Sequence, residues 1–212
     1  MTELLFKAMR SPEERALLYE KLRGAIMRCE RCRLGKTRTN VVPGEGNLTN
    51  RIMFVGEGPG EVEDEMGRPF VGPAGQLLTR ILEAAGFKRE DVYITNIVKC
   101  RPPGNRAPEI EEVLCCQGWL EAQIALLRPR VIVALGNTPL KWFLHSTGGI
   151  TKMRGRWFNW RGVSLMPMFH PSYLLRNQSR EKDGPKALTW HDIQQVYARY
   201  ESLKGTNDGA GE

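Results

Sequence analysis

One stretch of the chain, Met53–Gly60, constrains the fold more than any other. It begins with a short apolar run of the kind found in buried strands, and glycine and proline end this run abruptly. Gly56, Gly58 and Gly60 carry no Cβ, so their backbone can approach a ligand closely. Glu57 follows the predicted strand at its carboxyl end, where open α/β sheets bind their ligands. The stretch therefore predicts a small pocket, although an ordinary strand–helix connection has the same local pattern.

An aromatic side chain and a helix start follow this turn. Phe70 lies on a Pro-Phe corner, and an amphipathic pattern runs from Gly75 to Ala85 before it ends at Gly86. A carboxylate, bare backbone and an aromatic ring beside a helix start suit a flat ligand. The local pattern alone does not name that ligand.

Segments with strand and helix patterns alternate along the chain. The predicted strands cover residues 52–55, 92–98 and 131–135, with a hairpin-like pair over 155–168, and the predicted helices cover residues 11–27, 75–85, 108–127, 140–144 and 188–203. This alternation predicts an α/β fold, a three-layer α/β/α arrangement with a central, mainly parallel four-stranded sheet. We expect one domain over residues 1–204, with a disordered tail over residues 205–212.

The first helix has a well-marked start within the N-terminal segment 1–28. Ser11 is a capping serine, followed by proline in the first turn and by acids near the positive end of the helix. We expect this helix to lead directly into Cys29 and Cys32. Its apolar residues are predicted to share one side: Leu17, Leu18, Leu22, Ile26 and Met27.

Composition limits the class of protein. The hydrophobic fraction of 41% is that of a globular chain, no run is long and apolar enough to span a bilayer, and the N-terminus lacks a signal-peptide pattern. We therefore expect a soluble, cytoplasmic protein of prokaryotic type, monomeric and without membrane partners. The formal net charge of +7 favours a polyanionic partner such as nucleic acid.

The chain has five cysteines, and structural disulfides are not expected in a cytosolic protein. Cys29 and Cys32 form a C-x-x-C pair, which by itself can be a redox pair or a chance spacing. Cys100 and the adjacent Cys115 and Cys116 supply further thiols. Four thiolates can hold zinc or an iron–sulfur cluster, and the spacing does not decide between them.

Four motifs with the cysteines resemble a known family. In chain order the motifs are Gly56–Gly60 (GEGPG), Gly67–Gly72 (GRPFVG), Thr95–Pro103 (TNIVKCRPP) and His170–Arg176 (HPSYLLR). Together they closely resemble the family 4 uracil-DNA glycosylases, the iron–sulfur members of the uracil-DNA glycosylase superfamily. The resemblance implies a DNA repair enzyme that flips uracil out of single- or double-stranded DNA. Hydrolysis of the N-glycosidic bond then leaves an abasic site and free uracil.

The resemblance also implies a 4Fe-4S cluster. Its ligands would be Cys29, Cys32, Cys100 and Cys116. Matching the sequence that follows to the family pattern without a gap selects Cys116 over Cys115, and a shift of one residue would reverse this choice. We expect the cluster to have a positional role, because it would tie the N-terminal helix to the loop after the second strand.

The resemblance implies that two residues catalyse the cleavage of the N-glycosidic bond. His170 would donate a hydrogen bond to uracil O2 as the base leaves with negative charge. Glu57 would orient or deprotonate the attacking water, and its charge would favour the cationic sugar.

Five residues would recognise the flipped base. Phe70 would stack on it, and Gly56 and Gly58 would let the backbone approach it. Asn96 would donate to uracil O4 and accept from N3–H, a pattern that cytosine reverses. The family pattern also credits an acidic residue with excluding the thymine methyl group, and Glu63 matches that position best.

The segment after the histidine suits DNA contact. Tyr173, Leu174, Leu175 and Arg176 combine apolar side chains with an arginine, as in a wedge that fills the space left by a flipped base. Further cations are candidates for sequence-independent phosphate contacts. These are Lys99, Arg101, Arg106, Arg154, Arg156, Arg180, Lys182 and Lys186.

Three alternatives stay open at this point. The chain could be a superfamily relative with another base preference, or a relative that traps uracil-DNA covalently. It could also be a non-catalytic iron–sulfur module that binds DNA, as a domain accompanying a polymerase would. Residues 102–106 contain no histidine, which argues against covalent trapping. The presence of Glu57, Asn96 and His170 favours an enzyme.

Overall fold

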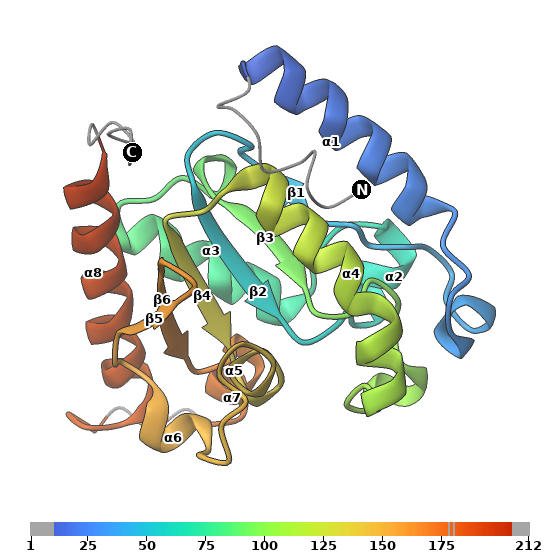
Figure 1. Cartoon of the computed structure of the whole chain (residues 1–212). Helices are drawn as coiled ribbons and strands as arrows, with labels where there is room; N and C mark the ends of the chain where they lie inside the picture. Colours follow the sequence, from blue (N-terminus) through green and yellow to red (C-terminus); the bar gives the residue numbers. More distant parts are fainter. Residues whose placement is uncertain (1–10, 178, 180, 205–212) are drawn as a thin grey trace.

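The computed structural model describes residues 11–177, 179 and 181–204 (Figure 1). The strands are β1 (Glu45–Gly46), β2 (Ile52–Gly56), β3 (Tyr93–Asn96), β4 (Val131–Leu135), β5 (Phe158–Trp160) and β6 (Val163–Met168). The helices are α1 (Pro12–Met27), α2 (Glu61–Met66), α3 (Pro73–Ala85), α4 (Ile110–Leu127), α5 (Asn137–Leu144), α6 (Ile150–Met153), α7 (Pro171–Arg176) and α8 (Pro185–Leu203). Short 3-10 turns are η2 (Arg33–Lys36), η3 (Arg89–Asp91) and η4 (Pro103–Asn105).

The described residues form a six-stranded mixed sheet in the order β1-β3-β2-β4-β6-β5. The four central strands are mutually parallel, whereas β1 and β5 pair antiparallel at the two edges. The prediction of a four-stranded sheet was therefore wrong, because the sheet also includes an antiparallel strand at each edge. Strand β1 has only two residues, too few for any periodic pattern. The hairpin-like pair is present as β5 and β6.

Helices cover both faces of the sheet, as the three-layer prediction required. The side chains of β2 alternate between two cores: Met53 and Val55 pack in the core under α1, α4 and α5. Ile52 and Phe54 pack in the core under α3 and α8. Figure 1 shows α4 in front of the sheet and α3 behind it. The apolar runs of the central strands follow from burial on both faces.

Helix α1 begins as predicted, but its buried side was predicted only in part. The Ser11 side chain accepts from the Glu14 backbone N–H and the Glu14 carboxylate accepts from the Ser11 backbone N–H, which completes a capping box. Leu17 and Met27 are 59% and 39% exposed, which corrects their assignment to the packed side. Tyr19 is buried instead, because its hydroxyl reaches Tyr93 of β3 at 3.0 Å.

Several helix boundaries differ from the predicted ones. Helix α2 was not predicted, since its polar sequence has no apolar stripe; it ends at Gly67, whose φ of 67° favours glycine. Residues 171–176 form α7, which is not among the predicted helices. The predicted tail, residues 205–212, lies outside the described residues. Among the helices that the structure describes, none has the length and apolar character needed to cross a membrane.

The topology gathers the predicted site at one edge of the sheet. Glu57 follows β2, Asn96 ends β3, Thr138 lies in the first turn of α5 after β4, and His170 follows β6. These four strand ends are all carboxyl ends of parallel strands. The chain runs from β2 to β3 on one side of β2, and then crosses from β3 to β4 on the other side. This reversal of strand order makes the edge a topological switch point, the usual place for a ligand.

Candidate active site

The carboxyl edge of the sheet holds a cavity of about 300 Å³. This volume lies at the lower end of the range for small-molecule sites. Most of the predicted site residues line this one cavity, although they come from distant parts of the chain. The predicted residues among its lining are Glu57, Gly58, Glu63, Phe70, Asn96, Arg106, His170 and Arg176.

His170 is held as a neutral imidazole with a defined tautomer. Its Nδ1 accepts from the Ser172 backbone N–H at 3.1 Å and lies 2.8 Å from the Ser172 hydroxyl. Burial, followed by the positive charge of Arg176, lowers the pKa of His170 to about 4. Because Nδ1 accepts a hydrogen bond, the single ring proton resides on Nε2. The group can therefore donate a hydrogen bond at neutral pH without carrying charge.

Glu57 is anchored by a residue that the sequence analysis did not single out. The Thr138 hydroxyl donates to Oε2 of Glu57, so the bond joins the turns that follow β2 and β4. One carboxylate oxygen is thereby oriented, while the side chain still lines the cavity. Thr138 carries a weak sequence signal, because Gly136-Asn-Thr-Pro directly follows a buried strand, as the glycine turn does after β2.

Asn96 presents an unusual buried acceptor to the cavity. The residue is 1% exposed, and its Oδ1 has no hydrogen-bond partner among the described residues. Nearly all buried polar atoms in proteins have a partner, so such an atom points to a ligand that donates to it. Behind the strand end, the buried Lys99 ammonium donates to the Asn96 carbonyl oxygen at 2.6 Å. This contact fixes the backbone that carries the carboxamide.

Phe70 packs against the floor of the cavity beside the histidine. Its backbone has a φ of 51°, and its ring centroid lies 5.6 Å from that of His170. A Cβ on Gly56 would lie 2.5 Å from the Phe70 ring, so this glycine makes room for the aromatic side chain. Gly75 plays the same part for the Phe70 backbone, which a Cβ there would overlap. Gly58 lines the cavity itself.

Glu63 contacts the loop that carries the phenylalanine. Its Oε1 accepts from the backbone N–H groups of Val71 at 2.9 Å and Gly72 at 2.8 Å. These two residues lie between Phe70 and the start of α3, so the carboxylate holds the aromatic corner against the helix. Glu63 also lines the cavity, as its proposed contact with the base requires.

The predicted wedge residues have different environments. Leu174 is 2% exposed and packs inside the protein, which corrects the expectation that it faces DNA. Tyr173 stacks on Phe169 with ring centroids 4.9 Å apart. Leu175 is half-buried and Arg176 is exposed at the cavity. In the short helix α7 the buried residues Pro171 and Leu174 are three positions apart and share the inner side, whereas Arg176 is exposed.

Two candidates for phosphate contact are excluded by burial. Lys99 is 1% exposed, and its ammonium also donates to Thr95 and Gln123 side chains at 2.7 and 2.8 Å. Burial lowers the pKa of Lys99 to about 7. Arg154 forms an ion pair with the buried Asp192.

Other cations predicted at the DNA surface already have internal partners. Arg101 contacts Glu61 at 3.1 Å, and Arg106 contacts the buried Glu112 at 2.7 Å. Arg156 and the lysines at 182 and 186 are exposed, whereas Arg180 lies outside the described residues.

All five cysteines line one small hollow between the N-terminal segment, the loop after β3 and helix α4. Three N–H donors point at three sulfurs: Trp119 at Cys29 (3.1 Å), Arg38 at Cys100 (3.1 Å) and the Lys99 backbone at Cys116 (3.3 Å). Cys116 is buried and Cys115 is half-buried. Burial raises the pKa of Cys116 to about 11. Among the described residues, no three Cys, His, Asp or Glu side chains are arranged to hold a metal ion.

Comparison with known proteins agrees with this geometry. The uracil DNA glycosylase superfamily profile matches residues 43–194. A type-4 uracil-DNA glycosylase from Thermotoga maritima is 55% identical over 166 residues, covering 77% of this chain and 86% of that one. A type-4 enzyme from Sulfurisphaera tokodaii is 44% identical, covering 77% and 78%, and a type-5 uracil-DNA glycosylase from Pyrobaculum aerophilum is 34% identical, covering 76% and 86%. The chain therefore belongs to the uracil-DNA glycosylase superfamily, and within it to the type-4 uracil-DNA glycosylases.

Proposed function

We propose that this protein removes uracil from DNA by hydrolysing its N-glycosidic bond, which leaves an abasic site and free uracil. One observation carries this function. A single cavity combines the Glu57 carboxylate, the unpartnered Asn96 Oδ1 and the neutral imidazole of His170. A hydrolase that recognises a neutral, hydrogen-bonding base needs these three kinds of group in one place.

Recognition begins with a base that has left the helix stack. Flipping requires a few kcal/mol, and stacking on Phe70 contributes about 1–3 kcal/mol towards it. Asn96 Oδ1 then accepts from uracil N3–H, while its amide NH2 donates to O4. Cytosine has an acceptor at N3 and a donor at position 4, so it would leave both amide groups unpaired. Glu63, which contacts the loop next to Phe70, is the proposed barrier to the thymine methyl group.

Bond cleavage separates charge between the sugar and the base. His170 donates from Nε2 to uracil O2 and stabilises the negative charge that the base gains. A neutral donor suits this role, because the proton stays on the imidazole while the base leaves as an anion. Glu57, oriented by Thr138, holds the attacking water and lies near the cationic sugar. Water supplies the hydroxyl group that ends on the sugar carbon.

The cysteine hollow fits a 4Fe-4S cluster on Cys29, Cys32, Cys100 and Cys116. Four thiols gather there, and N–H groups donate to three of their sulfurs, as hydrogen bonds do in iron–sulfur sites. When bound, such a cluster supplies a covalent cross-link between α1, α4 and the loop after β3. Lys99 precedes a ligand and contacts Asn96, so this cross-link would steady the recognition residue.

Turnover on a defined oligonucleotide tests the proposed function. The purified protein is incubated with a uracil-containing strand and then with alkali, and strand scission at the uracil is expected. A covalent adduct that shifts on a gel would indicate trapping, and neither product would indicate a binding module. Parallel strands with cytosine, thymine or hypoxanthine test the base preference. Brown protein with absorption near 400 nm is expected for the cluster, whereas a colourless sample with stoichiometric zinc would contradict it.

A further inference from the structure

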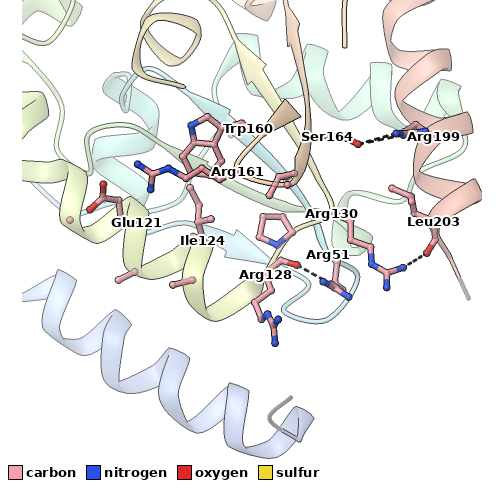
Figure 2. Close-up of a pocket in the computed structure, with 16 residues that line it drawn as sticks. Arg51, Glu121, Ile124, Arg128, Arg130, Trp160, Arg161, Ser164, Arg199 and Leu203 are labelled. Atoms are coloured by element: carbon pink, nitrogen blue, oxygen red, sulfur yellow. Dashed lines mark hydrogen bonds between the residues drawn. The ribbon is translucent and has the colours of Figure 1, made fainter. Parts of the chain in front are cut away.

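A second, larger cavity lies at the opposite edge of the sheet. It measures about 850 Å³ and is formed where β2, β4 and β6 begin, between the end of α4 and the end of α8. Its lining includes five arginines and a single acidic residue, Glu121. Figure 2 shows that the arginines come from separate elements around the cavity. Nothing in the proposed reaction uses this site.

Two of the five arginines have an evident structural task. Arg51 Nε donates to the carbonyl oxygen of Arg128 at the end of α4, at 2.9 Å. Arg130 Nη1 donates to the carbonyl oxygen of Leu203 at the end of α8, at 2.6 Å. Both cations satisfy carbonyl groups at helix C-termini, where positive charge is favourable. Their presence is explained without a ligand.

The other three guanidinium groups have no such task. Arg128, Arg161 and Arg199 are exposed, and none of them forms an ion pair with the described residues. Arg161 lies over the Trp160 ring at 4.9 Å. Arg199 lies over the Trp157 ring at 5.8 Å and makes long contacts of 3.4 Å with the Ser164 hydroxyl (Figure 2). Each can therefore offer its planar fork of N–H donors to an anion.

A further arginine outside the lining, Arg15, lies close to two of the lining arginines, Arg51 and Arg128. Arg15 of α1 donates to the Leu48 carbonyl oxygen, and its Nε is buried without a partner among the described residues. Burial and the positive charges of Arg51 and Arg128 lower the pKa of Arg15. The fold thus keeps three cations close together although they repel one another. An anion beside Arg128 would relieve that repulsion.

We propose that this cavity is a second nucleic-acid site, which binds the phosphodiester backbone of a DNA segment other than the one held at the active site. The guanidinium groups of Arg128, Arg161 and Arg199 project from three separate elements, the end of α4, the β5–β6 turn and α8. Separated cations suit a repeating polyanion, because each phosphate they neutralise releases counterions. Contacts of this kind carry no sequence preference. The site stands independently of uracil excision, since it reads only phosphate.

Binding of uracil-free DNA tests the site. A fluorescent single-stranded oligonucleotide without uracil is titrated against the wild type and the triple variant Arg128→Gln, Arg161→Gln, Arg199→Gln. The matched control removes three exposed cations from outside both cavities: Lys21→Gln, Arg80→Gln, Lys88→Gln. Two strands per wild-type chain are expected, and one per chain of the cavity variant. The slope of log Kd against the logarithm of the salt concentration should be smaller by about 2 for the cavity variant than for the wild type, because three phosphate contacts are lost.

Turnover and small anions separate this site from the active site. The cavity variant should cut a short uracil oligonucleotide at the wild-type rate within about twofold, so failure of the proposed function would show independently in the wild type. Equal binding losses in the cavity and control variants would overturn the second site, because they would reflect net charge alone. Displacement of the second strand by inorganic tripolyphosphate at an equal phosphate concentration would likewise overturn it in favour of a small-anion site.

Discussion

The two edges of the sheet are built on opposite principles. At the carboxyl edge, a cavity of about 300 Å³ holds side chains that neighbours fix in place, as Ser172 fixes His170 and Thr138 fixes Glu57. At the amino edge, a cavity of about 850 Å³ presents three exposed arginines that form no ion pair within the described part of the chain. The same strands end in one cavity and begin in the other.

The difference between the two edges follows from what bond cleavage and phosphate binding each require of the fold. Bond cleavage requires donors and acceptors that already point at atoms of one ligand. At the carboxyl edge, hydrogen bonds from neighbouring residues therefore hold the functional groups in position. Holding a phosphate backbone requires only positive charge within reach, so long side chains without fixed partners are sufficient. The four predictions that follow test this contrast.

Removal of the imidazole should have the largest effect. His170→Ala is expected to lower kcat on uracil-DNA by about 10²–10³-fold, the usual consequence of losing one oxyanion-type donor. Affinity for uracil-free DNA should stay within about twofold, because the phosphate contacts are unchanged. Single-turnover kinetics and anisotropy titration measure the two quantities. The triple arginine variant should show the reverse pattern, and equal losses of rate and affinity in His170→Ala would make the histidine a binding residue.

Lys99→Met should destabilise the carboxyl edge. The substitution removes the ammonium that donates to three buried acceptors: the Asn96 carbonyl, the Thr95 hydroxyl and the Gln123 amide oxygen. We expect a loss of about 3 kcal/mol in the free energy of unfolding, measured by denaturant titration. The exposed Lys88→Met is the matched control and should change stability by less than about 0.5 kcal/mol. Equal stability of the two variants would remove Lys99 from the support of the site.

Glu63→Ala should have a smaller effect, on catalysis. The loop that carries Phe70 loses the acceptor for two backbone N–H groups, so we expect kcat/KM on uracil-DNA to fall about 10-fold. Glu63→Gln keeps an oxygen acceptor and should recover most of the activity. Recovery by Gln would assign the role to hydrogen bonding. If Gln were as impaired as Ala, the negative charge itself would matter, as in a direct contact with the base.

The smallest effect on activity is expected in the pH profile of kcat. With a pKa of about 4, His170 stays neutral from pH 5 to 8, so kcat should show no step near 6.5, the ordinary value for histidine. Because the unfolded chain binds the proton more tightly, stability falls as the pH drops from 6.5 towards 4, by on the order of 3 kcal/mol. Rate profiles and acid unfolding of the wild type and His170→Gln measure both. A wild-type rate step near pH 6.5 that is absent in the variant would contradict a neutral buried imidazole.

The structure brings three residues with strong local signals to the same edge of the sheet. Glu57, Asn96 and His170 each follow or end a buried apolar strand, and the rule for parallel sheets brings such positions to one edge. The burial of Lys99 could not be predicted, since it opens a basic segment rich in proline, and the pattern of residues 170–176 did not decide which leucine packs inside. Burial of a lysine is improbable for any sequence unless distant partners satisfy it, and here Gln123 of α4 does so.

The chain by itself determined the alternation of its main strands and helices, the residues at the strand ends and the cysteine pair beside the first helix. These features depend on neighbours within a few residues, through apolar periodicity, caps and turns. Only the tertiary structure decided which side chains orient the reactive groups and which cations stay unpaired. Those outcomes depend on contacts between residues far apart in sequence, such as Glu57 with Thr138, which no local pattern encodes.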